Sequence, residues 1–252
     1  MNELLLSPYI IAMVFFFVAL VYSSVGLGGG SSYTALMALL GFSTLAIPMV
    51  SLILNLLVTT VGSYNFIRKK HARLRLILPF VVTSIPMAYF GGSLQLGADM
   101  FYLLLMFSLV LVAVRIYFLP ETSMRLNISP ARKLLLSLFI GAALGFIAGT
   151  VGIGGGIYLV PLILILGLGN AREAAASGAI FIWINSLFGL ASRLQYNSID
   201  LLAYVPLLVA VVIGGAMGSW LGANRYQPRT MEKILGVIII VAIVALGRKL
   251  LA

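Results

Sequence analysis

The 252-residue chain is 62% hydrophobic and 9% charged, whereas an ordinary soluble domain is about 25% charged, so the composition predicts an all-α polytopic membrane protein. The chain has no cysteine and a single histidine, His71, so we expect no disulfide, iron–sulfur cluster, metal site or other cofactor. The formal charge of +10 is better explained by basic cytoplasmic loops than by a nucleic-acid partner, because no soluble block interleaves basic and aromatic residues.

The first apolar segment covers residues 8–42 and is interrupted by glycines within Val25-Gly26-Leu27-Gly28-Gly29-Gly30. As one straight helix it would be about 50 Å long, well beyond the ~30 Å hydrocarbon core of a bilayer. Each glycine costs a helix about 1 kcal/mol relative to alanine, so four glycines in five positions should unwind it. We therefore predict a hairpin, with one arm at 8–25 and a shorter returning arm at 31–40.

Three membrane spans are predicted next, at about 44–67, 76–93 and 101–118. The turn at 68–75 carries five Lys or Arg residues, which places it in the cytoplasm. The remaining segments are a second broken segment at 134–168 and spans at about 174–194, 201–221 and 234–247. The predicted organisation is thus a first transmembrane repeat at 1–118, a cytoplasmic linker at 119–133 and a second transmembrane repeat at 134–252.

The two halves share landmarks in the same order. The motif Val151-Gly152-Ile153-Gly154-Gly155-Gly156 follows the first by 126 residues, and Gly41 matches Gly167 at the same offset. If each broken segment enters and leaves on one side, each half crosses three times and the halves are inverted repeats. The distribution of basic residues does not separate this arrangement from a single passage through each break; segment length favours the hairpin. Inverted repeats with broken helices are a recurring plan of secondary transporters.

The glycine breaks are the candidate substrate site. A half-helix that starts at such a break presents unpaired backbone N–H groups and a partial positive charge, which suit an anion. Ser31 and Ser32 follow the first break and could cap the returning arm or donate hydroxyls to an oxyanion. Asn55 and Asn185 lie deep in the following spans. The expected substrate-binding residues are Gly28, Gly29, Gly30, Ser31, Ser32, Asn55, Gly154, Gly155, Gly156, Tyr158 and Asn185.

Each of these features also has a purely structural interpretation. Gly-x-x-x-Gly spacing lets helices pack closely, and a buried Asn can bond to a neighbouring helix. Pro161 should fall in the first turn of the second returning arm, where proline is tolerated. Arg115, near the inner end of its span, either attracts anions or extends its charge to the interface.

The acidic residues fall at or near segment ends: Glu3, Asp99, Glu121, Glu173, Asp200 and Glu232. We therefore expect no cation site or proton relay at mid-membrane. One histidine and peripheral acids supply no obvious nucleophile with a base, so we expect no catalytic residues and no enzyme.

At these positions the chain resembles the sulfite exporter TauE/SafE family of membrane permeases. The resemblance rests on the duplicated Gly-x-Gly-Gly-Gly, Pro161-Leu162, Gly167, Asn185-Ser186, Gly189 and Ser198-Ile199-Asp200. The first half departs from the pattern, with Ala35 at the position that matches Pro161. The resemblance implies transport of a small sulfur-containing anion, such as sulfite, a sulfonate or thiosulfate, across the bacterial cytoplasmic membrane.

The leading hypothesis is a secondary transporter that works by alternating access around the two breaks. The alternatives are a substrate-free scaffold or assembly subunit, whose breaks would be dry and closely packed, and an anion channel. The expected partners are a small anionic substrate and the lipid bilayer. The sequence leaves the oligomeric state, the coupling ion and the direction of transport open.

Overall fold

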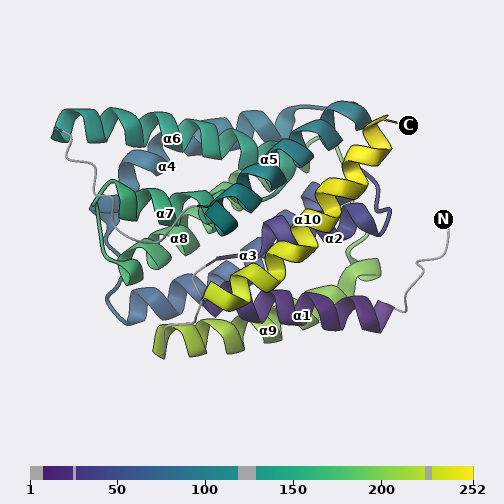
Figure 1. Ribbon diagram of the computed structural model, residues 1–252, viewed down its shortest axis with the longest axis horizontal. Coiled ribbons are helices and arrows are strands. Elements are labelled where there is room, and N and C mark those ends of the chain that lie inside the picture. Colours follow the sequence, from purple (N-terminus) through teal and green to yellow (C-terminus); the bar gives the residue numbers. More distant parts are fainter. Residues whose placement is uncertain (1–7, 25–26, 119–128, 225–228, 252) are drawn as a thin grey trace.

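The computed structural model describes residues 8–24, 27–118, 129–224 and 229–251 (Figure 1). Within these ranges the secondary structure is helical, which confirms the predicted all-α class. The first half contains α1 (Pro8–Ser24), α2 (Gly30–Leu39), α3 (Ala46–Arg68), α4 (Leu74–Ser93) and α5 (Ala98–Phe118). The second half contains α6 (Pro130–Val151), α7 (Gly156–Ile165), α8 (Ala171–Arg193), the 3₁₀ turn η1 (Leu201–Tyr204), α9 (Val205–Asn224) and α10 (Arg229–Leu251).

Six helical segments of the described chain are long and apolar enough to cross a bilayer: α3, α4, α5, α6, α8 and the continuous stretch Leu201–Leu221. The membrane-length parts of α3 and α8 are each 61% buried, against 28–44% for the other four. These two helices pack against each other and form the centre of the bundle. The arrangement is that of a multi-pass membrane protein.

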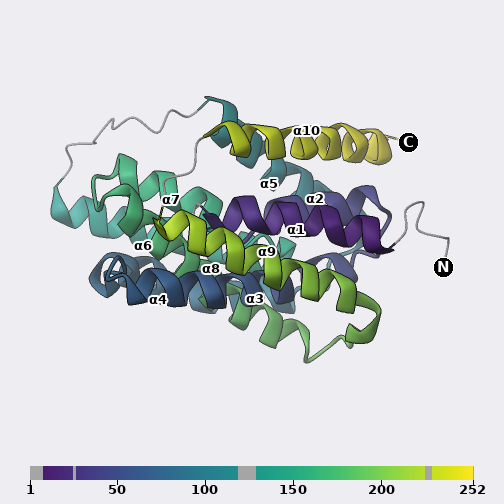
Figure 2. The same ribbon diagram turned by 90° about the horizontal axis from the view of Figure 1, so that it is seen from below.

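The turns gather at two ends of the molecule. Arg73, Lys133 and Leu168 line one cavity, so the 69–73 turn, the start of α6 and the end of α7 lie together; we call this the basic end. Thr44, Gln95 and Asn197 line another cavity, so the turns after α2, α4 and α8 lie together at the opposite end. Figures 1 and 2 show the start of α1 and the end of α10 at this opposite end too.

Both broken segments turn back on themselves. The second starts with α6 and finishes with α7 at the basic end. In the first, α1 lies parallel to α9, because Gly214 and Gly218 of α9 pack against the carbonyl oxygens of Phe16 and Leu20. Since α9 starts at the opposite end, α1 starts there as well, and α2 returns there.

Helices of the first half pack extensively against helices of the second half. The most extensive contacts join α4 to α6 and α1 to α9, which lie side by side in Figure 1. Both interfaces depend on glycine, because an added Cβ would collide with the facing backbone carbonyl. In the α4–α6 interface Gly141, Gly145 and Gly149 face the carbonyls of Phe80, Ser84 and Ala88.

Local sequence signals explain where the helices begin and end. Ser129 is the N-cap of α6 with Pro130 next to it, so the helix begins inside the expected linker; residues 119–128 lie outside the described residues. The returning arms end alike, because the N–H groups of Phe42 and Leu168 bond back to the carbonyls of Met37 and Ile163, as in a Schellman motif.

Pro161 lies in the second turn of α7, which starts at Gly156. The expectation of a first-turn proline was wrong, because the helix begins immediately after its glycine N-cap. Proline has no backbone N–H, so the hydrogen bond that this position would ordinarily donate to the carbonyl four residues earlier is missing.

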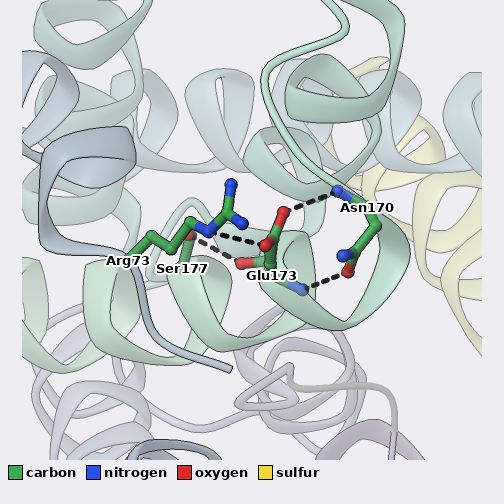
Figure 3. A network of polar contacts seen from close by, with 4 residues as sticks. All are labelled: Arg73, Asn170, Glu173 and Ser177. Carbon is green, nitrogen blue, oxygen red and sulfur yellow. Dashed lines mark hydrogen bonds and ion pairs between the residues drawn. The ribbon is translucent and has the colours of Figure 1, made fainter. Parts of the chain in front are cut away.

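A polar network at the basic end joins the two halves (Figure 3). Asn170 accepts from the Glu173 N–H and the Glu173 carboxylate accepts from the Asn170 N–H, which forms a capping box at the start of α8. Arg73 of the first half pairs with the same carboxylate, with Nε 2.7 Å from Oε1. The Arg73 side chain is 66% exposed, so the pair is worth about 0–1 kcal/mol, and the capping box matters at least as much.

Candidate functional site

The two returning arms start in the same way at their glycine breaks. Gly29 and Gly155 are the N-caps of α2 and α7, with φ of 88° and 76°, a left-handed conformation that glycine adopts without strain. Glycine supplies no capping side chain, so the first N–H groups of both helices need partners from elsewhere. Val25 and Gly26 of the first motif lie outside the described residues.

The breaks meet at the centre of the molecule, and α3 joins them. A Cβ on Gly30 would lie 2.5 Å from the Ile153 carbonyl oxygen of the other break. The Ser51 hydroxyl donates to the Gly152 carbonyl at 2.7 Å, with a longer 3.4 Å contact to that of Gly30. Asn55 also donates from Nδ2 to the Gly152 carbonyl, at 3.2 Å. The structure therefore brings together Asn55 and both glycine motifs.

Asn55 lies between the two breaks. An added Cβ on Gly28 would lie 2.6 Å from the Oδ1 atom of Asn55. An added Cβ on Gly30 or on Gly154 would lie 2.6 or 3.0 Å, respectively, from its Nδ2 atom. The side chain is fully buried, and Oδ1 has no hydrogen-bond partner among the described residues. Buried polar atoms without a partner are rare in folded proteins. Asn55 thus has a hydrogen-bonding group to offer where the two breaks meet.

Asn185 does not occupy the equivalent place in the second half. Ile182 does, because an added Cβ on Gly28, Gly154 or Gly156 would contact its side chain. Asn185 lies about one turn further along α8, and its Nδ2 donates to the Phe181 carbonyl of its own helix at 2.8 Å. One side of the meeting point is therefore polar and the other is apolar.

A cluster of hydroxyls surrounds the start of α2. Gly29, not a serine, is the N-cap, and the hydroxyls of Ser31 and Ser32 donate to the Tyr22 phenol oxygen at 3.3 and 3.1 Å. The Tyr33 hydroxyl is buried and has no partner in the part of the chain that the structure describes, and a Cβ on Gly29 would lie 2.9 Å from it. Tyr22 and Tyr33 were not among the residues expected from sequence, although both flank the motif by a few positions.

The second break offers a different set of groups. Tyr158, the positional match of Ser32, donates from its hydroxyl to the Ser108 carbonyl of α5 at 2.6 Å. Tyr158, Pro161 and Arg115 line a largely apolar cavity of about 260 Å³ between α5, α6 and α7. Arg115 is 8% exposed, so this cation lies within the protein beside the second returning arm.

Carboxylates are remote from this meeting point in the described part of the chain. Glu173 is engaged at the basic end, Asp200 caps η1 by accepting from the Leu202 N–H, and Asp99 lies in the first turn of α5. The described residues contain no group of three or more His, Cys, Asp or Glu that could hold a metal ion. Helix N-termini and neutral polar groups surround the meeting point, together with the carbonyls at the end of α6.

The model of one protein family, described as sulfite exporter TauE/SafE, matches residues 11–246. The chain belongs to the sulfite exporter TauE/SafE family. A probable membrane transporter protein of Sinorhizobium fredii, y4hK, is 34% identical over 245 residues, covering 96% of this chain and 97% of the relative.

More distant relatives carry similar descriptions. The probable membrane transporter protein YdhB of Bacillus subtilis is 23% identical, covering 89% of this chain and 93% of its own. The probable membrane transporter protein MJ0441 of Methanocaldococcus jannaschii is 26% identical, covering 83% and 82%. No solved structure matches the chain. Membership of the TauE/SafE family makes this protein a multi-pass membrane transporter.

Proposed function

We propose that this TauE/SafE protein is a secondary transporter of small sulfur-containing anions, such as sulfite, sulfonates or thiosulfate, in a bacterial cytoplasmic membrane. The observation that carries the proposal is the meeting of two glycine-capped helix N-termini, bridged by Ser51 and Asn55. Each N-terminus contributes about half a positive charge and free N–H donors. A compact oxyanion between them would be bound without any basic side chain.

Alternating access supplies the space that the substrate needs. The breaks are closely packed, since Cβ atoms on Gly28, Gly30 and Gly154 would all collide with neighbours. We infer that the halves separate around this point to admit the anion, first from one side and then from the other. Helix directions support inverted repeats as the framework, because the first half starts at the opposite end and the second at the basic end.

Close packing at the breaks is also what a substrate-free scaffold would show, so flux is the deciding experiment. We expect proteoliposomes containing the protein to take up radiolabelled sulfonate or thiosulfate with saturation, and uptake should accelerate when unlabelled anion is loaded inside. A channel would show no such acceleration, and a scaffold would show no flux. Failure of every sulfur anion tested to move above the rate of empty liposomes would contradict the proposal.

Topology provides a second prediction. The basic turn at 69–73 should be cytoplasmic, which puts both chain ends outside. We expect a periplasm-dependent reporter enzyme fused after Ala252 to be active in a bacterial host. Arg248 and Lys249 oppose this placement by roughly 1 kcal/mol each. The hairpins still favour it, because each broken segment has about 20 Å more helix than a single passage needs. A fusion active only in the cytoplasm would contradict this orientation in the membrane.

A further inference from the structure

A second place in the molecule is suited to an anion, and it lies at the opposite end. The turns after α2, α4 and α8 enclose a cavity of about 330 Å³, within the usual range of small-ligand pockets. Arg193 and Asn197 of the second half line it, as do Thr44 and Gln95 of the first. Its remaining wall is mostly apolar and includes Phe101.

Arg193 is the charged group of this cavity and it is 5% exposed. Its Nε and Nη2 donate to the Gly149 carbonyl at 3.2 and 3.0 Å, and Nη2 donates to the Thr150 carbonyl at 2.6 Å. These carbonyls belong to the last turn of α6, two and three residues before Gly152 of the second break. A guanidinium has five N–H donors, so the Nη1 pair is left without a partner in the described part of the chain.

Capping α6 explains the position of Arg193, and the negative end of the helix dipole offsets part of its charge, but it supplies no counter-ion. The Glu173 carboxylate pairs with Arg73 at the other end of the molecule. Asp99 is exposed and Asp200 caps η1, and neither lines the cavity. A buried cation without a counter-ion is costly. A bound anion would supply that counter-ion, and a planar guanidinium matches two oxygens of an oxyanion.

We propose that the cavity around Arg193 is an outer anion-binding site, in which a sulfate-like or sulfonate oxyanion binds Nη1 while Thr44, Gln95 and Asn197 supply neutral donors. The inference rests on the proposed function, since an outer site serves a permease by collecting its anion beside the second break. The bound anion would lie beside Arg193, which bonds to the last turn of α6 just before Gly152 of the second break.

The cysteine-free chain allows a binding test that needs no transport. Gln95→Cys places a single thiol in the cavity wall, and its reaction with a maleimide is followed in purified, detergent-solubilised protein. We expect sulfate or methanesulfonate, at ten times its dissociation constant, to slow labelling about tenfold, and chloride at equal ionic strength to have no such effect. Asp99→Cys is the matched control, because it lies nearby outside the cavity and should label at an unchanged rate.

Arg193 is then changed in the Gln95→Cys background. Arg193→Gln should abolish protection, whereas Arg193→Lys, which keeps the charge and can still bond to the α6 carbonyls, should retain part of it. Size-exclusion profiles check that each variant is folded, and the Lys variant carries the test if the Gln variant is not. Full protection in Arg193→Gln, or equal protection of Asp99→Cys, would overturn the inference. A wild-type protein without flux but with Arg193-dependent protection would refute the proposed function alone.

Discussion

Gly29→Val and Gly155→Val are each expected to abolish anion uptake in proteoliposomes while the protein still inserts in the membrane. Valine at φ of 88° or 76° costs about 1–2 kcal/mol in backbone strain. Its Cβ would also lie 2.8 Å from the Tyr33 ring at Gly29, or 2.9 Å from the Phe181 ring at Gly155. The start of the returning helix would have to shift, which moves the N–H groups that face the substrate.

Gly41→Val is the control for the first of these variants. Gly41 has φ of 74° but an added Cβ meets nothing within 4 Å, so this variant carries the backbone strain without the collision. We expect Gly41→Val to transport at near the parental rate with slightly lower thermal stability. Parental transport by either break variant, or equal loss in Gly41→Val, would show that the glycine breaks have no special role.

Asn55→Leu should lower transport at least about tenfold, which corresponds to 1.4 kcal/mol in the transition state, without a matching loss of stability. Leucine is of similar size and removes the unpartnered Oδ1. The Gly152 carbonyl keeps its 2.7 Å bond from Ser51, so the change should cost the fold no more than about 1 kcal/mol. If Asn55 had a purely structural role, Asn55→Leu would lower the stability and leave transport by the folded protein unchanged.

Asn185→Leu is the matched control for Asn55→Leu. It also removes a buried Asn whose Oδ1 has no partner among the described residues, but its amide donates to the Phe181 carbonyl of its own helix and not to a break. Uptake rates and melting temperatures of the two variants should therefore separate, with transport lost in Asn55→Leu alone. A greater loss of transport in Asn185→Leu would move the site away from the polar side of the breaks.

Helix positions could be predicted from the sequence because they depend on local signals. Runs of apolar residues about 20 long, the Ser129-Pro130 start and the glycine interruptions each act within a few residues of the chain. The broken segments were recognisable from their length alone, since 35 residues exceed one membrane passage. The helix α6 begins at Pro130, four residues before the expected start of the second repeat at 134.

The equivalence of Asn55 and Asn185 could not be judged from residue type. The helices α3 and α8 start 125 residues apart, at Ala46 and Ala171, so an Asn 130 residues after Asn55 faces another direction. Only the packing of α8 against both breaks shows that Ile182 takes the equivalent place.

Tyr22, Tyr33 and Arg193 were missed for a related reason. Tyrosine in a membrane helix is ordinary, and the hydroxyl cluster forms only because α1 and α2 fold back around the break. Arg193 is the last residue of α8, a position where an arginine is ordinarily exposed. It is buried because the last turn of α6, remote in sequence, packs over it.

A structure determined with bound methanesulfonate would test the central claim most directly. The account predicts density for the anion between the N-termini of α2 and α7, next to Asn55, with Gly28–Gly30 moved away from Gly154–Gly156 to make room. Density confined to other places, with the two breaks still packed together at saturating anion, would contradict it.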